Sequence, residues 1–504
     1  MNQHTFHDLS YLLLLWTTTA TSSSLDGKTP KLILISMDGF RYDYLDNVPS
    51  EKITNFTNLI QNGVKAKYLE NVFPTVTYPN HMTLVTGLYP ESHGVIHNSF
   101  WDPYLEDGFS LIDFRRNFES KWFDTGAEPI WVTNFKAGSS RDSGVILWPA
   151  GVAQIKSYMP RVIPAGDDFN ETNWNLRVDT LVKWFQSDKS NIRPINLGIL
   201  YFPDPDETAH EFGPDKIDGT ITDEVQQKIF QLDASLGYLK KKLNESNLWD
   251  EMNIIITADH GHTNLLSLEK GQINLDKYNI DRKFYKTGSD MKNHLVVNLE
   301  PTEGTDVEKL YQNLSAIPKM HVYRKCDANL TKLHYCKNRR IMQFVLEAEE
   351  GYYIGNTDTL KYISKGGHGY DQNKVPKMRP FFIAFGPSFR KGFISEPFES
   401  VNIYPLMCHI LGIHPAPNNG SLDKVRHLLI QQPFIRTETF QLTLMTFLTV
   451  FVFATCICGL YSIGAFYQVR FRRRKRKRGG HGGQEYRKSL LKDDKDDEES
   501  CDEL

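Results

Sequence analysis

Several short runs of apolar, largely β-branched residues constrain the fold of this chain more than any other feature. They are Lys31 to Ser36, Ile195 to Phe202, Asn253 to Ala258, His294 to Leu299 and Pro380 to Phe385. Continuous apolar runs of this length are typical of strands buried on both faces of a parallel sheet. Between them, apolar residues recur every three or four positions from Ile221 to Leu243, which predicts a helix packed on the sheet. We therefore expect an α/β domain over residues 25–430, with a mostly parallel central sheet and helices on both faces.

Two apolar segments near the ends of the chain indicate targeting to a membrane. Residues 1–24 hold a short apolar run followed by small residues, as in a signal peptide. Residues 442–467 carry no charge and are long enough to cross a bilayer, and the basic run Arg472 to Arg478 follows them. By the positive-inside rule, we expect a single-pass type I protein of the cell membrane. Its domain would be extracellular, followed by a stalk at 431–441 and a cytoplasmic tail at 468–504.

Other features of the sequence agree with this topology. The apolar segment could instead be a buried core helix, and the basic run could be a nuclear signal. A stop-transfer segment, however, explains the apolar segment and the basic run together. Cys326 and Cys336 could pair in an oxidising compartment. A formal net charge of -3 argues against a nucleic-acid partner. Six sequons for N-glycosylation precede the apolar segment, at Asn55, Asn170, Asn244, Asn313, Asn329 and Asn419.

Potential metal ligands follow three of the predicted strands directly. They are Asp38, Asp206 and the pair Asp259 and His260; His210 lies four residues after Asp206, and His368 lies in the Gly-rich loop KGGHGYD. The carboxyl ends of parallel strands meet at one edge of a sheet, so these side chains could converge there. Individually, an Asp-Gly turn or a tight glycine loop would explain them without a metal. Together, three aspartates and three histidines suit two zinc ions.

A candidate nucleophile lies in the segment FPTVTYPNH, from Phe73 to His81. Pro79 suits the first turn of a helix, which would place Thr77 at the helix N-terminus, where free amides favour phosphate. A threonine hydroxyl needs a metal to act as a nucleophile at neutral pH. Thr77 could equally be an N-cap residue. The predicted metal ligands favour the catalytic role.

These motifs resemble, in order, those of the nucleotide pyrophosphatase/phosphodiesterases, within the alkaline phosphatase superfamily. The matching segments run from Asp38 to about Asn419, through MDGFRYDYL, FPTVTYPNHMTLVTGLYPESHG, DPDETAHEFGP, TADHGH, GGHGYD and FGPSF. The segment PAPNNGS, from Pro415 to Ser421, is most similar to the short members four and five. The resemblance implies an alkaline phosphatase-like fold.

The resemblance also implies roles for individual residues. One zinc ion would be bound by Asp206, His210 and His368 and the other by Asp38, Asp259 and His260, with Thr77 as the nucleophile and as an additional metal-binding residue. Asn98 matches an asparagine that donates to a phosphate oxygen. Tyr78 and Tyr201 match aromatic residues that hold a nucleobase, and Phe169 replaces a family tyrosine. His262 stands where the family usually has methionine, and Ala209 where it has glycine.

The implied reaction is a two-step hydrolysis of a nucleotide-type phosphodiester or phosphoanhydride through a phospho-threonine. Dinucleoside polyphosphates, NAD and nucleoside triphosphates are the expected substrates. A choline-lipid phosphodiesterase, acting on a lysophospholipid or sphingomyelin, is one alternative. A non-catalytic binding or adhesion ectodomain is another, although such proteins usually lose a ligand or the nucleophile. A sulfatase would need Cys or Ser in C/S-x-P-x-R, where this chain has Thr-Tyr-Pro-Asn.

Overall fold

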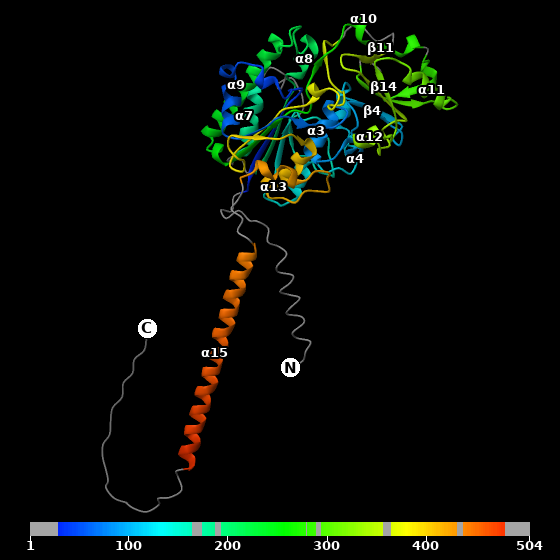
Figure 1. Cartoon of the computed structure of the whole chain (residues 1–504). Helices are drawn as coiled ribbons and strands as arrows, with labels where there is room; N and C mark the ends of the chain where they lie inside the picture. The colour runs from blue at the N-terminus through cyan, green and yellow to red at the C-terminus, as the bar shows by residue number, and fades with distance from the viewer. Residues whose placement is uncertain are drawn as a thin grey trace, which may run out of the picture. The chain divides into compact units, whose positions relative to one another are not determined.

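The computed structural model describes residues 29–163, 174–186, 193–278, 280–288, 294–355, 364–430 and 437–478 (Figure 1). The chain divides into two units, Met1–Ile430 and Gln431–Leu504.

An eight-stranded sheet forms the centre of the first unit. Its strand order is β19 (Phe393–Ser395), β2 (Val64–Ala66), β18 (Phe382–Phe385), β9 (Met252–Thr257), β1 (Lys31–Met37), β8 (Leu197–Phe202), β6 (Ser143–Ile146) and β7 (Arg161–Ile163). Only β18 is antiparallel to its neighbours, and the other pairs are parallel. The predicted mostly parallel sheet is confirmed, with the run at Pro380 to Phe385 as its one reversed strand.

Helices cover both faces of this sheet, as predicted. Alternate residues of β1 enter different cores: Leu32 and Leu34 lie in one, and Ile33 and Ile35 in the other. The first core includes residues of α3 (Thr77–Thr86), α6 (Ile130–Lys136) and α13 (Ile403–Leu411), and the second of α2 (Thr54–Gln61), α7 (Trp174–Phe185) and α9 (Asp223–Glu245). Helix α9 is the helix that the apolar periodicity predicts.

A second, smaller sheet holds a strand that the sequence assigns to the central sheet. Its antiparallel order is β12 (Tyr285–Thr287), β13 (Val296–Pro301), β15 (Phe344–Ala348) and β14 (Met320–Arg324), with α11 (Val307–Ser315) packed against β14. The run from His294 to Leu299 forms β13 of this small sheet, so its predicted place in the central sheet was wrong. Val296 packs in the core that contains Leu32, whereas Val297 packs in a separate core of the small sheet. Because both faces of β13 are buried, its sequence is continuously apolar although the strand is antiparallel.

Short elements complete the first unit. They are the strand pairs β3 (Leu69–Glu70) with β20 (Phe398–Glu399), β4 (Ser99–Asp102) with β5 (Asp107–Ser110), β10 (Thr263–Asn264) with β17 (Gly366–Gly367), and β11 (Gln272–Asn274) with β16 (Tyr353–Gly355), and the helices α4 (Pro90–His93), α5 (Ser120–Phe123), α8 (Asp206–Phe212), α10 (Leu268–Gly271), α12 (Ala328–Lys332) and α14 (Leu422–Val425).

The described part of the second unit is one long helix, α15 (Thr437–Arg478). Its segment Met445–Arg474 is long and apolar enough to cross a membrane. The predicted span at 442–467 lies within α15. The predicted signal peptide and the tail after residue 478 lie outside the described residues.

Candidate metal centre and active site

The side chains that the sequence singles out meet at the carboxyl ends of three adjacent strands. Asp38 follows β1, Asp206 begins α8 shortly after β8, and Asp259 and His260 follow β9. Strand β1 lies between β8 and β9 and is parallel to both, so the three strand ends reach the same edge of the sheet. The six predicted ligands form two groups there, each with its ligand atoms within 4.8 Å of one another.

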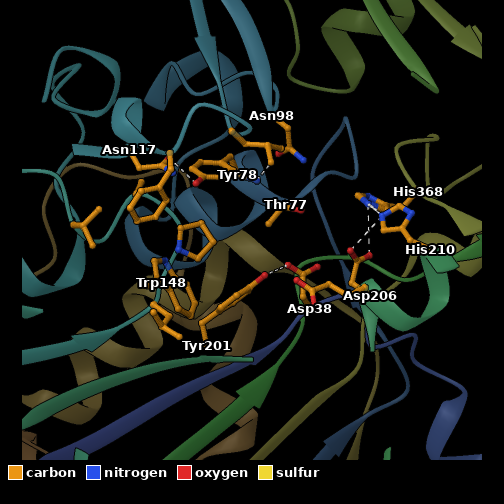
Figure 2. A pocket seen from close by; sticks show the side chains of 17 residues that line it. Asp38, Thr77, Tyr78, Asn98, Asn117, Trp148, Tyr201, Asp206, His210 and His368 are labelled. Atoms are coloured by element: carbon orange, nitrogen blue, oxygen red, sulfur yellow. Dashed lines mark hydrogen bonds and ion pairs between the residues drawn. The ribbon is translucent and has the colours of Figure 1, made fainter. Parts of the chain in front are cut away.

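The first group consists of Asp206, His210 and His368. Asp206 and His210 lie one turn apart on α8, with Oδ2 and Nε2 3.2 Å apart. His368 follows β17, and its Nε2 lies 3.2 Å from His210 Nε2 and 3.6 Å from Asp206 Oδ1. Figure 2 shows these three side chains on one side of Thr77.

The second group, Asp38, Asp259 and His260, is almost completely buried. His260 Nε2 lies 3.0 Å from Asp259 Oδ2 and 3.4 Å from Asp38 Oδ1. Burial raises the pKa of Asp38 well above its ordinary value, and the charges of Asp259 and Asp206 raise it further. Carboxylates crowded in this way repel one another unless a cation lies between them.

The ligand atoms fit tetrahedral metal coordination. Two ligands bound about 2.0–2.1 Å from a tetrahedral zinc ion lie roughly 3.3 Å apart, close to the separations within both groups. One oxygen each of Asp38, Asp206 and Asp259 is buried and has no hydrogen-bond partner among the described residues. A buried carboxylate oxygen without a donor is costly, and a bound cation would satisfy it.

The three histidines of these groups present the same ring nitrogen to the site. Nδ1 of His210, His260 and His368 lies 3.0 Å from the backbone oxygen of Gly366, Gly261 and Thr75, respectively. Each Nδ1–H can therefore donate to a carbonyl, which leaves Nε2 as a lone-pair donor directed at the cluster. Backbone carbonyls commonly orient metal-binding histidines in this way.

Thr77 is the first residue of α3, and Val76 occupies the N-cap position. The hydroxyl of Thr77 does not cap the helix; its Oγ1 lies 3.5 Å from His260 Nε2. The alternative interpretation of Thr77 as an N-cap residue is therefore not observed. The hydroxyl lies beside the second ligand group, at a helix N-terminus that favours an anion.

The loop before α3 is held by side chains to which the sequence analysis gave no role. Asn80 is buried, accepts from Val72 N at 2.9 Å and donates to the backbone oxygens of Pro74 and Val76. The hydroxyl of Thr75 donates to Tyr370 O and accepts from Gly369 N. Thr75 therefore joins the loop that carries Thr77 to the loop that carries His368.

Asn98 is oriented by the same helix N-terminus. Its Oδ1 accepts from Tyr78 N at 2.8 Å, so the side-chain oxygen is used and the Nδ2 group is the donor that remains. Asn98 and Thr77 both line the cavity beside the ligands. The Nδ2 group of Asn98 can therefore donate to an anion bound there.

A cavity of about 410 Å³ opens beside Thr77, lined by aromatic and apolar side chains (Figure 2). Tyr78 and Tyr201 both line it, but their hydroxyls are engaged: Tyr78 donates to Asn117 Oδ1 at 2.7 Å and Tyr201 to Asp38 Oδ2 at 2.6 Å. Burial and then the charge of Asp38 raise the pKa of Tyr201 well above its ordinary value, so it remains a donor. Trp148 adds a third aromatic ring that the sequence analysis missed. Phe169 lies outside the described residues.

Two further histidines contact the ligand groups. His81 is buried, with Nδ1 2.8 Å from Thr77 O and 3.5 Å from Asp259 Oδ2. His262 is fully buried, with Nδ1 3.1 Å from Asp206 Oδ1. Both lie in motifs that the sequence analysis quoted, but spacing alone gives no sign that they touch a ligand.

The predicted modification sites fall in different environments. Asn244, Asn313, Asn329 and Asn419 are exposed, and Asn170 lies outside the described residues. Asn55 is half-buried and donates through Nδ2 to Asp233 Oδ2 at 2.8 Å. This bond engages the nitrogen that a glycan would occupy.

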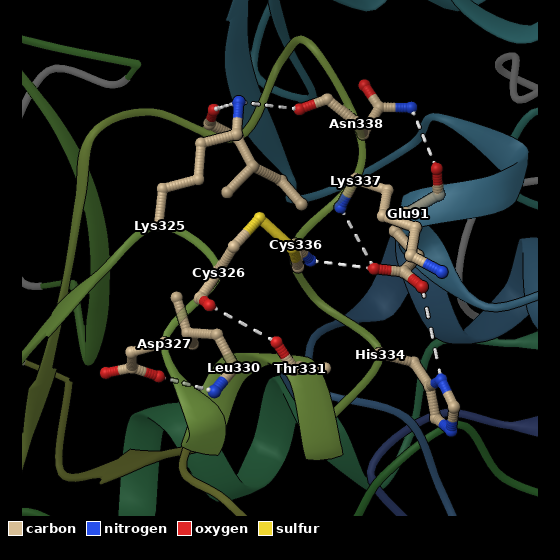
Figure 3. Close-up of a disulfide and its surroundings, with 11 residues drawn as sticks. Glu91, Lys325, Cys326, Asp327, Leu330, Thr331, His334, Cys336, Lys337 and Asn338 are labelled. Carbon is tan, nitrogen blue, oxygen red and sulfur yellow. Dashed lines mark hydrogen bonds and ion pairs between the residues drawn. A yellow bond between two sulfur atoms is a disulfide. The ribbon is translucent and has the colours of Figure 1, made fainter.

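Cys326 and Cys336 form a disulfide beside α4 (Figure 3). Glu91 of α4 accepts from the backbone nitrogens of Cys336 and Lys337, at 2.8 and 3.0 Å. Asp327 caps α12 by accepting from Leu330 N. The disulfide segment is therefore tied both to α12 and, through Glu91, to α4.

Comparison with known proteins agrees with this geometry. Residues 32–371 match the family model of type I phosphodiesterase/nucleotide pyrophosphatase. Human ectonucleotide pyrophosphatase/phosphodiesterase family member 5 is 39% identical over 414 residues, covering 81% of this chain and 80% of the relative. Mouse bis(5′-adenosyl)-triphosphatase enpp4 is 36% identical over 419 residues, with 81% and 84% covered.

The fold is also that of a solved relative. The structure of an inactive threonine-to-alanine variant of murine ectonucleotide pyrophosphatase/phosphodiesterase 5 in complex with AMP matches with a TM-score of 0.71 and 37% identity. The match covers 80% of this chain and 100% of the murine one. The predicted alkaline phosphatase-like architecture is confirmed. This chain belongs to the type I phosphodiesterase/nucleotide pyrophosphatase family, whose members are hydrolases of phosphodiester and pyrophosphate bonds.

Proposed function

We propose that this chain is an extracellular two-zinc enzyme that hydrolyses nucleotide phosphodiesters or phosphoanhydrides through a phospho-threonine at Thr77. Dinucleoside polyphosphates, NAD and nucleoside triphosphates are its proposed substrates. The observation that most supports this proposal is the convergence of six nitrogen and oxygen ligands, in two groups, beside one hydroxyl at a helix N-terminus. The same convergence argues against a non-catalytic ectodomain.

The two ligand groups would each hold one zinc ion: Asp206, His210 and His368 the first, and Asp38, Asp259 and His260 the second. Mixed carboxylate and imidazole ligands suit zinc, and three protein ligands leave a coordination position open. When bound, such ions lower the pKa of nearby hydroxyl groups and offset negative charge on phosphoryl oxygens.

In the proposed first step, Thr77 Oγ1 attacks phosphorus and forms a P–O bond as the bond to the leaving group breaks. The Oγ1 proton passes to solvent water, and the departing oxygen takes a proton from solvent. Asn98 Nδ2 donates to a non-bridging oxygen, and the N-terminus of α3 favours the phosphate's charge. In the second step, water attacks phosphorus, and Thr77 regains its hydroxyl as the nucleoside monophosphate leaves.

The aromatic cavity supports a nucleotide as the retained group. Tyr78, Trp148 and Tyr201 supply flat apolar surfaces next to Thr77, and such surfaces bind a nucleobase by stacking. The relatives point the same way, since one is named a bis(5′-adenosyl)-triphosphatase and another was solved with AMP. We propose that Phe169 also contributes to base binding.

The test is the Thr77→Ala variant assayed on diadenosine triphosphate, NAD and lysophosphatidylcholine. We expect turnover of the nucleotides to fall on the order of 10³-fold or more, with folding and zinc content unchanged. Turnover like that of the native chain would reject Thr77 as the nucleophile. Preference of the native chain for lysophosphatidylcholine would support the choline-lipid alternative instead.

A further inference from the structure

A second cavity lies next to the metal ligands and has no role in the proposed reaction so far. It has a volume of about 220 Å³, and its lining includes His97, Ser99 and Ile112. It shares four lining residues with the aromatic cavity, namely Asn98, Leu111, His210 and His368. Thr77 and Asp38 line the aromatic cavity but not the second one.

The two cavities therefore meet at His210 and His368 of the first ligand group, whereas Thr77 lines only the aromatic cavity. Figure 2 shows Thr77 between the aromatic side chains and the pair His210 and His368. That pair, together with Asn98 and Leu111, forms the boundary shared with the second cavity. In an in-line displacement, the leaving oxygen departs on the side of phosphorus opposite the attacking oxygen. A group leaving away from Thr77 Oγ1 would pass His210 and His368 and reach the second cavity.

We infer that this second cavity is the subsite for the leaving group. In a dinucleoside polyphosphate, the leaving group is the nucleotide that departs when the other nucleotide is transferred to Thr77. The inference rests on the proposed function and assigns each cavity to one of the two nucleotides of the substrate. The aromatic cavity would hold the retained nucleoside monophosphate. The second cavity would hold the phosphate and ribose portion of the departing nucleotide.

The lining of the second cavity places the polar side chains of Ser99 and His97 among apolar ones such as Leu265, and a ribose hydroxyl can contact the polar ones. Ser99 lies on β4, and its hydroxyl donates to Ser110 Oγ at 3.2 Å, which leaves the lone pairs of Ser99 Oγ available to a ribose hydroxyl. His97 Nδ1 accepts from Ser99 N at 3.3 Å, and burial lowers the pKa of His97 to about 3, so its ring is neutral. The volume is below the roughly 300 Å³ typical of sites that enclose a whole ligand. The outer part of the departing nucleotide would therefore extend past Ile112 into solvent.

Ile112 forms the exposed edge of this cavity. Its side chain is 78% exposed, so a larger residue at this position can be accommodated without disturbing the core. Leu111, beside it, lines both cavities. Bulk added at Ile112 should therefore obstruct the second cavity selectively.

The test compares two substrates that transfer the same adenylyl group to Thr77. Diadenosine triphosphate releases ADP, whereas the p-nitrophenyl ester of AMP releases a small phenolate that departs readily without binding. In Ile112→Trp and Ser99→Leu, we expect the ratio of kcat/KM for diadenosine triphosphate to that for the ester to fall at least tenfold. In the control Phe114→Ala, which alters only the aromatic cavity, both values should change together and the ratio should stay constant.

The outcomes separate this inference from the proposed function. A ratio within twofold of the native value in Ile112→Trp, a variant that should fold, would overturn the leaving-group subsite. Failure of the native chain to hydrolyse either substrate would instead overturn the proposed function. Ser99→Leu provides an independent second variant at another position in the lining.

Discussion

His262 lies in an environment that its sequence motif does not suggest. Its ring is fully buried, lies 3.1 Å from Asp206 Oδ1 through Nδ1, and contacts the rings of His210 and His368 at centroid distances of 4.5 and 5.2 Å. It therefore touches all three members of the first ligand group. Side chains that contact a metal ligand on the side away from the metal fix the orientation of that ligand and so affect metal affinity.

Replacement of His262 should weaken metal binding at the first ligand group. In His262→Leu, which keeps the bulk but loses the imidazole nitrogens next to the ligand group, we expect zinc affinity to fall about 10- to 100-fold. Competition with a chromogenic chelator would measure this without relying on activity. In His262→Gln, a side-chain amide can replace the contact, and much of the affinity should remain. Equal affinity in the native chain and His262→Leu would show that His262 only fills space.

The sequence predicts well which of the proposed ligand side chains meet at this site, but it predicts poorly the side chains that support them. Asp38, Asp206 and Asp259 follow or lie just after apolar strands, so the rule for parallel sheets locates them from the order of residues alone. His262, His81 and Asn80 act through contacts between segments far apart in the chain. Spacing carries no information about such contacts. Thr75 and Thr77 show the difference within one motif, since one ties two loops together and the other faces the ligands.

At the level of elements, the disulfide stabilises the segment that follows β14. Cys326 and Cys336 are separated by ten positions, and their pairing restricts the unfolded chain. For Cys326→Ala with Cys336→Ala, we expect the free energy of unfolding to fall by about 2–3 kcal/mol. Chemical denaturation would measure it. Reductant should not change the free energy of unfolding of the double variant, whereas it should lower that of the native chain to the value of the double variant. Equal stability of the oxidised native chain and the double variant would contradict this role.

A buried ion network ties the same segment to β4. Asp102, which is fully buried, accepts from Arg339 Nε and Arg340 Nε at 2.8 and 2.7 Å. Arg340 also donates to the backbone oxygens of Gly94 and Trp122. Burial alone would raise the pKa of Asp102, but the two guanidinium groups hold it well below its ordinary value.

Removal of this carboxylate should destabilise the fold in a pH-dependent way. Asp102→Ala leaves Arg340 buried without its partner, and we expect a loss of about 3–5 kcal/mol near neutral pH. Because the folded pKa is depressed, the stabilisation is complete above the unfolded value near 4 and is lost as pH falls below it. Thermal unfolding of both proteins from pH 7 to pH 3 would show the difference shrinking in acid. Asp113→Ala, which removes an exposed ion pair with Arg115, is the control and should change the Tm little.

The strands also show that local sequence is insufficient to predict strand direction. The runs at β1, β8 and β9 correctly predict parallel strands, because all three are buried between two helical layers. The runs at β13 and β18 are equally apolar but pair antiparallel. Their direction depends on the path of the preceding connection, which apolar periodicity does not encode.

For the whole molecule, we propose that α15 anchors an extracellular enzyme, with the basic end of the helix in the cytoplasm. The full-length protein in cell membranes should resist extraction at high salt and alkaline pH and require detergent. Trypsin should cleave the basic run after residue 470 only when the membrane is permeabilised. Cleavage in sealed cells would reverse the proposed orientation, and release by salt would reject the anchor.

With this topology, we propose that residues 1–24 are removed as a signal peptide. We propose glycans at Asn55, Asn170, Asn244, Asn313, Asn329 and Asn419. Asn55 is the position at which modification would have to displace the bond to Asp233.

The proposed chemistry depends on two metal ions held by the two ligand groups. The most direct measurement is the zinc content per folded chain, by inductively coupled plasma mass spectrometry, after dialysis of the detergent-solubilised protein. We expect two ions in the native chain, about one in Asp206→Ala with His210→Ala, and about one in Asp38→Ala with Asp259→Ala. A native chain that folds but retains no zinc, or variants that retain as much as the native chain, would contradict the two-metal site.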